Sequence, residues 1–196
     1  MPTVLNVGAG ESQEIPPWYA GWKNVRLDVD PSTGADIVCD ARLLQERVPE
    51  GSCDAIYCSH NLEHYLPHDG ARVLQGFLHV LKPEGFAEIR VPDIGETIRA
   101  VVQRGLDLED ELYNSPAGPI RVLDVLYGWQ AEIARSGRDY YAHKTGFTLK
   151  SLVRALVHAG FREVFRLRTG VLFELHVVAF RQPPNDSQRG LFRTAV

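Results

Sequence analysis

The chain has few cysteines and no large excess of either charge. Only three of its 196 residues are cysteines, Cys39, Cys53 and Cys58, and no two of them have the C-x-x-C spacing. An odd number of cysteines in or beside apolar runs indicates buried free thiols rather than a disulfide framework. A formal net charge of −4 gives no overall electrostatic reason to expect nucleic acid as a partner. We therefore expect a cytoplasmic protein that binds no nucleic acid.

Long hydrophobic segments are also missing. No apolar stretch approaches the roughly 20 residues that a membrane-spanning helix needs. The first residues, MPTVLNVGAG, lack the basic region and long apolar segment of a secretory signal peptide. Hydrophobic residues nevertheless make up 44% of the chain, and 196 residues suffice to bury a core without disulfides. We expect a globular chain with no membrane span, and the composition leaves its oligomeric state open.

Short apolar runs alternate with helical patterns along the chain. Runs bounded by glycine, proline or aspartate predict strands at 3–7, 25–29, 35–39, 54–58 and 86–91. Apolar residues at a 3-4 spacing predict a helix over 69–82 and a later helix that Thr148 caps and Gly160 ends. Two final strands, within 162–169 and 171–180, are predicted to meet in a tight turn at Thr169-Gly170. This order predicts an α/β sheet with helices on both faces and an antiparallel pair at its end.

We expect one domain over residues 1–180, interrupted by a helical insertion at about 93–147. The insertion contains two predicted helices, about 93–106 and 119–136, joined by a loop rich in proline, glycine and asparagine. Insertions near the ends of strands commonly cover a site. Residues 181–196 begin with the polar segment RQPPNDSQRG, which predicts a flexible tail.

A glycine turn follows the first predicted strand. In VGAGES, Gly8 and Gly10 allow a tight turn and let a ligand approach the backbone closely. Asp28 lies in the next predicted strand, where a carboxylate can accept hydrogen bonds from both ribose hydroxyls of an adenosine ligand. The dinucleotide-binding motif requires a third glycine where this chain has Gln13. The negative charge of Glu11 would also repel a pyrophosphate. A cofactor without phosphates, such as S-adenosylmethionine, therefore fits better.

Six segments in this order resemble class I S-adenosylmethionine-dependent methyltransferases, particularly the small methyltransferase type 11 group. They are VLNVGAG, VRLDVDP, DIVCDA, SCDAIYCSHNLEHY, FLHVLKPEGFAEIRVPD and FTLKSLVRALVHAGF. The resemblance covers about residues 3–91 and, more loosely, 140–180. It implies a Rossmann-like, doubly wound, mostly parallel seven-stranded sheet with a C-terminal antiparallel strand pair, and S-adenosylmethionine as cofactor. The chain departs from the pattern after Gly10, where IPPWYAGW leaves room for a brief first helix at most.

The same resemblance implies a set of cofactor-binding residues. By position these are Asn6, Gly8, Ala9, Gly10, Asp28, Val29, Asp40, Ala41, Ser59, His60 and Leu62. The first four surround the methionyl part, Asp28 binds the ribose, Val29 lies beside the adenine, and Asp40 and Ala41 lie near the adenine amino edge. The last three line the cofactor and the methyl-transfer pocket.

Methyl transfer from a sulfonium requires the protein mainly to align the nucleophile and to exclude water. A base is needed only where the acceptor must lose a proton, as a sugar hydroxyl or phenol would. His60 and His143 are the preferred catalytic candidates because histidine titrates in the right range. We expect a small-molecule or glycan-type acceptor with an oxygen nucleophile. A cofactor-binding protein without catalysis is the alternative.

The string HNLEH at residues 60–64 also matches H-x-x-E-H, the inverted zinc-peptidase pattern. That pattern requires His60 and His64 on one face of a helix. His60 instead follows a predicted strand directly, and Pro67 would disrupt a helix interior soon after His64. We therefore assign no metal ligands and expect His60 to face the cofactor while Glu63 and His64 brace the loop. A zinc peptidase is kept as a third possibility.

Overall fold

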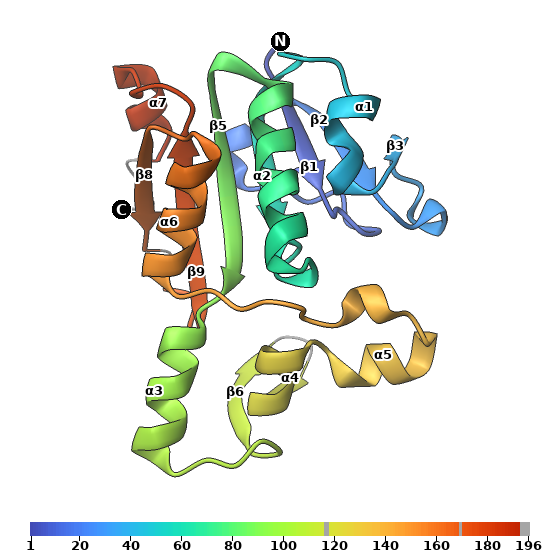
Figure 1. The fold of residues 1–196 in the computed structure, drawn as a ribbon, viewed down its shortest axis with the longest axis vertical. Helices are drawn as coiled ribbons and strands as arrows, with labels where there is room; N and C mark the ends of the chain where they lie inside the picture. Colours follow the sequence, from blue (N-terminus) through green and yellow to red (C-terminus); the bar gives the residue numbers. More distant parts are fainter. Residues whose placement is uncertain (116–117, 169, 193–196) are drawn as a thin grey trace.

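The computed structural model describes residues 1–115, 118–168 and 170–192, and its centre is a seven-stranded sheet (Figure 1). The sheet has the order β3-β2-β1-β4-β5-β9-β8. Its strands are β1 (Thr3–Val7), β2 (Lys23–Asp28), β3 (Ile37–Val38), β4 (Cys53–Ser59), β5 (Leu81–Pro92), β8 (Glu163–Leu167) and β9 (Glu174–Phe180). Strands β1 to β5 pair in parallel, and β9 is antiparallel to β5 and β8. The predicted Rossmann-like, mostly parallel seven-stranded sheet is confirmed.

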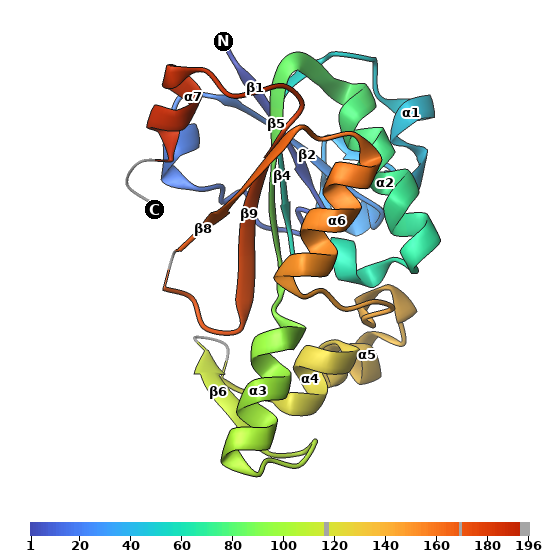
Figure 2. The same ribbon diagram turned by 60° about the vertical axis from the view of Figure 1, so that its left-hand side comes forward.

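Three helices cover one face of this sheet (Figure 2). They are α1 (Leu44–Arg47), α2 (Pro67–Val80) and α6 (Leu149–Ala159). Buried side chains such as Phe77 of α2 and Leu152 of α6 pack with those of β1, β4 and β5 in the main core. The helix predicted over 69–82 and the late helix between Thr148 and Gly160 are therefore confirmed. Among the described residues, every helix lacks the length and apolar character needed to traverse a bilayer.

The opposite face is covered by aromatic side chains rather than by long helices. Between β1 and β2 the only helical element is the short 3-10 turn η1 (Pro17–Tyr19), as the IPPWYAGW segment predicted. Tyr19 packs in a cluster with Phe86, Phe180 and Phe192. Phe192 follows α7 (Asp186–Leu191), where the sequence predicted a flexible tail. The structure differs from that prediction up to Phe192, because this side chain is buried against the sheet.

The insertion lies beyond the carboxyl ends of the parallel strands (Figure 1). It contains α3 (Ile94–Arg104), the hairpin β6 (Glu111–Ser115) and β7 (Gly118–Arg121), α4 (Val122–Tyr127) and α5 (Gln130–Ser136). The first predicted helix is confirmed, but the continuous helix predicted at 119–136 is wrong. Its start is a strand, and Gly128, with φ 93°, separates α4 from α5. The turn predicted at Thr169-Gly170 involves Thr169, which lies outside the described residues.

Replacing Thr148 with alanine is expected to lower the free energy of unfolding by about 1 kcal/mol. The Thr148 hydroxyl accepts a hydrogen bond from the Ser151 amide, and the Ser151 hydroxyl accepts one from the Thr148 amide. Alanine leaves the Ser151 amide at the start of α6 without this partner. Urea unfolding measures the loss, and Thr148→Ser serves as the control because it keeps the hydroxyl. Equal stability of the two variants would contradict the capping role.

Candidate active site

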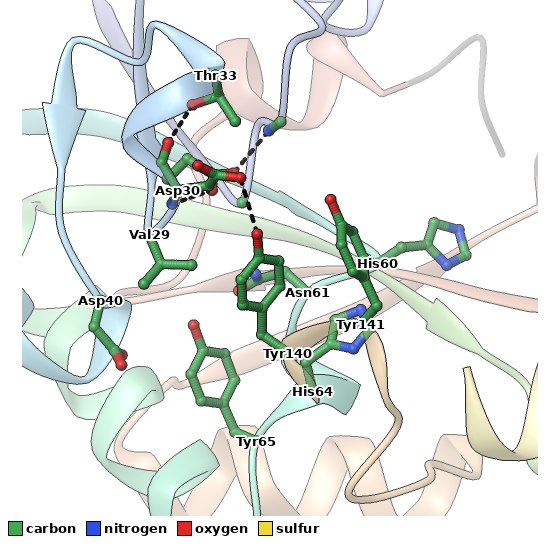
Figure 3. Close-up of a pocket in the computed structure, with 13 residues that line it drawn as sticks. Val29, Asp30, Thr33, Asp40, His60, Asn61, His64, Tyr65, Tyr140 and Tyr141 are labelled. Carbon is green, nitrogen blue, oxygen red and sulfur yellow. Dashed lines mark hydrogen bonds between the residues drawn. The ribbon is translucent and has the colours of Figure 1, made fainter. Parts of the chain in front are cut away.

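A cavity lies at the carboxyl ends of β1, β2 and β4, next to the end of the insertion (Figure 3). Its lining comes from segments far apart in the sequence: Gly8, Gly10, Asp28, Val29, Asp30, Thr33, Asp40, His60, Asn61, His64, Tyr65, Tyr140 and Tyr141. Six of these were predicted to bind the cofactor: Gly8, Gly10, Asp28, Val29, Asp40 and His60. Ligands of open α/β sheets sit at this edge.

The glycine turn forms one side of the cavity. Gly8 and Gly10 have φ values of 71° and 56°, in the left-handed region that favours glycine. A Cβ atom on Gly8 would lie only 2.4 Å from Nδ2 of Asn61, whereas one on Gly10 would meet no atom within 4 Å. The Gly10 amide donates to the Asp28 carboxylate at 2.8 Å. The turn is thus closed on the Asn61 side and open towards the cavity at Gly10.

The carboxylates of Asp28, the last residue of β2, and of Asp30 both lie in the lining of the cavity. Asp28 is almost fully buried, and its second oxygen accepts a hydrogen bond from the Asp30 amide at 2.9 Å. Asp30 in turn accepts from the Tyr140 hydroxyl at 2.9 Å and forms an ion pair with Arg138. Hydrogen bonds from Ser32, and then from Tyr140, hold the pKa of Asp30 below its usual range. Charged contacts therefore tie the insertion to the end of β2.

Apolar and aromatic groups line the far end of the cavity. Figure 3 shows Val29 and Asp40 on one side, with Tyr65 and Tyr140 across from them. Val29 is 44% exposed although it is apolar. Asp40 is ion-paired with Arg42 at 2.7 Å. A slot with an exposed valine, two tyrosine rings and a carboxylate can hold a flat base that carries an amino group.

The other predicted cofactor residues lie outside this lining, as far as the structure describes the chain. Asn6, Ala41 and Leu62 are buried in the protein interior. Leu62 belongs to the main core that α2 helps to form and does not line this cavity. Ala9 and Ser59 are half-buried and do not line the cavity either.

The sequence interpretation also missed several residues of the lining. Asp30 and Tyr140 form the hydrogen bond across it, and Asn61 and Tyr65 flank the loop after β4. The second acid of LDVDP was a usable signal for Asp30, because it directly follows the predicted ribose-binding strand.

A second cavity adjoins the first, and His60, His64 and Tyr141 line both. Its other lining residues come from the loop after β4, the end of β5, the insertion, the segment before β9 and the start of β9. They are Glu63, Pro92, Tyr113, Ile120, Asp124, Val125, Trp129, His143, Val171, Leu172, Phe173 and Glu174. Trp129, Val171 and Leu172 are each more than half exposed. The second cavity therefore combines polar groups with exposed apolar ones.

His60 stands at the junction of the two cavities in a conformation that is unusual for a residue with a side chain. Its φ is 49°, a left-handed value that costs about 1–3 kcal/mol and is typical of functional sites. Its Nε2 lies 2.8 Å from Glu174 and its Nδ1 lies 3.4 Å from Glu63. Burial alone would lower the pKa of His60, but the hydrogen bond with Glu174 and the charge of Glu63 raise it. The protonated ring suits an electrostatic role better than the base predicted from the sequence.

His64 and His143 lie side by side in the floor of the second cavity, with ring centres 5.0 Å apart. His64 Nδ1 contacts the carbonyl oxygen of Ala142 at 3.1 Å, and His143 Nδ1 contacts that of Val125 at 2.9 Å. Burial lowers the pKa of His143. The contact between His64 and the Ala142 carbonyl oxygen agrees with the expected bracing role of His64. His60 and His143, the two predicted catalytic residues, line the same cavity.

The zinc-peptidase pattern is not formed. Residues 62–64 make the single 3-10 turn η4 (Leu62–His64), and His60 precedes it in a left-handed conformation. His60 and His64 therefore do not share a helix, and the helix that follows, α2, begins only at Pro67.

Part of the chain matches a known protein family. Residues 5–89, which carry the glycine turn, Asp28, Asp40 and the loop after β4, match a family described as a methyltransferase domain. The resemblance to methyltransferases that the sequence predicted is confirmed over these residues. A search of curated protein sequences gave no match.

Solved methyltransferases share the fold at low sequence identity. An S-adenosylmethionine-dependent methyltransferase from Archaeoglobus fulgidus is 14% identical, with a TM-score of 0.58 over 91% of this chain and 86% of that one. The 1,6-didemethyltoxoflavin-N1-methyltransferase of Burkholderia thailandensis, solved with its acceptor and S-adenosylhomocysteine, is 18% identical. Its TM-score is 0.53 over 93% of this chain and 72% of that one. A possible histamine N-methyltransferase from Thermotoga maritima is 12% identical, with a TM-score of 0.56 over 93% and 83% of the two chains.

Proposed function

We propose that this methyltransferase moves a methyl group from S-adenosylmethionine to an oxygen atom of a small-molecule or glycan-type acceptor. The observation that carries the proposal is the meeting of two cavities at His60, His64 and Tyr141. A cofactor in the first cavity can present its methyl group to an acceptor in the second across this junction.

The residues of the first cavity fit the cofactor. Gly10 leaves open space for the methionyl part beside the backbone. Each Asp28 oxygen accepts one backbone hydrogen bond, and a carboxylate oxygen can accept two, so the ribose hydroxyls find free acceptor sites. Val29, Asp40 and Tyr65 would surround the adenine. The bound cofactor supplies a methyl group already activated on a sulfonium.

The protein's own task is then to position the acceptor and to exclude water. The insertion supports both, because its contacts with Asp30 hold it against the first cavity while its residues wall the second. Trp129 and Leu172 offer apolar surface for the body of a small acceptor. We propose that His60 and His143 contact its reactive end. The Burkholderia protein, which is named for the acceptor 1,6-didemethyltoxoflavin, supports the small-molecule part of this proposal.

The proposal is tested by following a labelled methyl group. The protein is incubated with methyl-¹³C S-adenosylmethionine and, in separate samples, with the small-molecule fraction of a cell extract, a glycan digest and the macromolecular fraction of the extract. Asp28→Ala, which is expected to bind the cofactor more weakly, serves as the control. NMR of the labelled product identifies the atom that carries the methyl group. We expect a methyl ether or ester. A methyl group on nitrogen would overturn the assigned nucleophile, and label found only in protein or nucleic acid would overturn the acceptor class.

Replacing Tyr140 with phenylalanine is expected to weaken S-adenosylhomocysteine binding about 2- to 10-fold. The change removes the hydrogen bond between the insertion and Asp30, and such a bond contributes about 0.5–1.5 kcal/mol. Isothermal titration measures the effect. Tyr127→Phe is a matched control because Tyr127 is an exposed tyrosine of the same insertion, outside both cavities. Equal affinity in the two variants would show that the insertion does not hold the cofactor through Asp30.

A further inference from the structure

We propose that Glu63, His64 and His143 form a binding site for one divalent transition-metal ion in the floor of the second cavity. One possible ligand atom of each residue lies within 4.8 Å of those of the other two. Two imidazoles and one carboxylate are a set that binds such ions in many proteins. Three observations about these side chains support the site.

The first observation is the state of Glu63. Its side chain is completely buried, and neither carboxylate oxygen has a hydrogen-bond partner among the described residues. Its Oε1 lies in an ion-pair contact with His60 Nδ1 at 3.4 Å, and Nε2 of His143 is 3.9 Å away. An ionised carboxylate withdrawn from water without hydrogen bonds is costly, and buried charges are normally paired or bind metals. A cation between Glu63, His64 and His143 would bind carboxylate oxygens that have no hydrogen-bond partner among the described residues.

The second observation concerns the imidazole nitrogens. The Nδ1 atoms of His64 and His143 each contact a backbone carbonyl oxygen, at 3.1 and 2.9 Å. A carbonyl oxygen only accepts hydrogen bonds, so Nδ1 carries the proton in both rings and Nε2 presents a lone pair. Metal-bound histidines have this arrangement, with the second nitrogen fixed by a carbonyl or carboxylate. In both rings the proton therefore lies on Nδ1, and Nε2 is free to bind a metal ion.

The third observation is the backbone that joins the two halves of the site. The amides of Lys144 and Thr145, directly after His143, donate to the Glu63 carbonyl at 2.8 and 3.1 Å. The segment that returns from the insertion is thereby fixed to the loop after β4. It places His143 next to Glu63 and His64. An ion bound at about 2.1 Å from each ligand needs ligands about 3.0–3.5 Å apart. Binding therefore draws the three side chains together by about an ångström.

The ligand set indicates which ions fit. Two nitrogen ligands favour borderline ions such as Zn²⁺ or Co²⁺ over Mg²⁺ and Ca²⁺, which prefer oxygen ligands. Three protein ligands leave coordination positions open, as in catalytic rather than structural sites. The H-x-x-E-H interpretation did not find this site, because it paired His60 with His64 and the third ligand comes from the insertion.

The site also narrows the acceptor class, and this step alone rests on the proposed function. A hydroxyl oxygen that occupies an open position next to the junction becomes more acidic. Its proton passes to solvent, the oxygen forms a bond to the methyl carbon, and the carbon–sulfur bond breaks with its electron pair on sulfur. No electron is gained or lost by the ion. Acceptors with a hydroxyl or neighbouring oxygens that bind the ion are thus favoured.

The test measures metal binding without any methyl transfer. The full chain is stripped with a chelator and titrated with Co²⁺, with Zn²⁺ competition and Mg²⁺ for comparison, while visible absorption and thermal unfolding are recorded. We expect about one equivalent of Co²⁺ with a visible absorption band, displacement by Zn²⁺, no displacement by Mg²⁺ and a rise in Tm on binding. Glu63→Gln and His143→Gln should each weaken binding at least tenfold. His79→Gln, whose ring also contacts a backbone carbonyl but lies elsewhere, should bind like wild type.

Two results would overturn the site: less than about a tenth of an equivalent bound to wild type, or equal affinity in wild type and His143→Gln. Glu63→Gln guards against misfolding, because the amide has nearly the shape of the carboxylate, and the Tm of the metal-free variant shows whether it is folded. The proposed function is judged separately. Metal binding together with a nitrogen-methylated product would support the metal site and overturn the oxygen nucleophile. An oxygen-methylated product without metal binding would support the oxygen nucleophile and overturn the metal site.

Discussion

Replacing Glu88 with alanine is expected to destabilise the folded protein by about 3–5 kcal/mol. Glu88 lies in β5, is completely buried and accepts hydrogen bonds from Trp18 Nε1 and the Tyr19 hydroxyl at 2.9 and 2.8 Å. Its other oxygen lies 2.7 Å from Nε2 of the buried His176. Alanine leaves these three polar groups without their partner inside the aromatic cover of the sheet. The cover has no long helix to replace that anchor, so the loss should appear as global destabilisation.

Urea unfolding, followed by circular dichroism, measures this effect. Glu88→Gln is the matched variant, because its amide oxygen can still accept from Trp18 and Tyr19. We expect it to lose about 1 kcal/mol, the scale of a single altered hydrogen bond. An alanine variant within 1 kcal/mol of wild type would show that Glu88 does not anchor the cover.

Replacing Asp28 with alanine is expected to weaken binding of S-adenosylhomocysteine by about 1–3 kcal/mol, or roughly 5- to 150-fold. The carboxylate lies in the first cavity and holds the Gly10 amide at 2.8 Å. Its removal takes away the proposed ribose acceptor and releases the glycine turn. Isothermal titration measures the affinity, and thermal unfolding confirms that the variant is folded.

Two further variants separate the contributions. Asp36 also accepts a backbone hydrogen bond, from Arg26 at 2.7 Å, but lies outside the cavity, so Asp36→Ala should bind like wild type. Asp28→Asn keeps an oxygen for the Gly10 amide and should lose less affinity than alanine. Unchanged affinity in Asp28→Ala would refute the assignment of Asp28 as the ribose-binding residue. Asp30 would then be the next carboxylate to test.

The sequence predicted those parts of the fold that depend on local patterns. Buried parallel strands are nearly continuous apolar runs, so β1 was located to the residue and β4 to within one residue at each end. Gly8, Gly10 and Asp28 were found because strand ends place them at one edge of the sheet, and Asp40 was found through the resemblance to methyltransferases. The helix α6 was found through its cap and its apolar stripe.

The parts that were missed depend on contacts between distant residues. The pairing of Asp30 with Tyr140 spans 110 positions, and no local pattern marks it. His143 meets Glu63 and His64 only because the insertion returns along the loop after β4. In the insertion, an apolar stripe continued across Gly128 and suggested one helix, but the close approach of the Tyr141 carbonyl requires a glycine with positive φ there. The burial of Phe192 likewise follows from an aromatic cluster assembled by the fold.

The central claim is that the first cavity holds the cofactor and delivers its methyl group at the junction with the second. A crystal structure of the chain with S-adenosylhomocysteine tests it most directly. The account predicts ribose hydroxyls within hydrogen-bond distance of Asp28, the adenine between Val29 and Tyr65, and the sulfur directed at His60 and Tyr141. Cofactor bound at another edge of the sheet, or with its sulfur turned away from the second cavity, would contradict it.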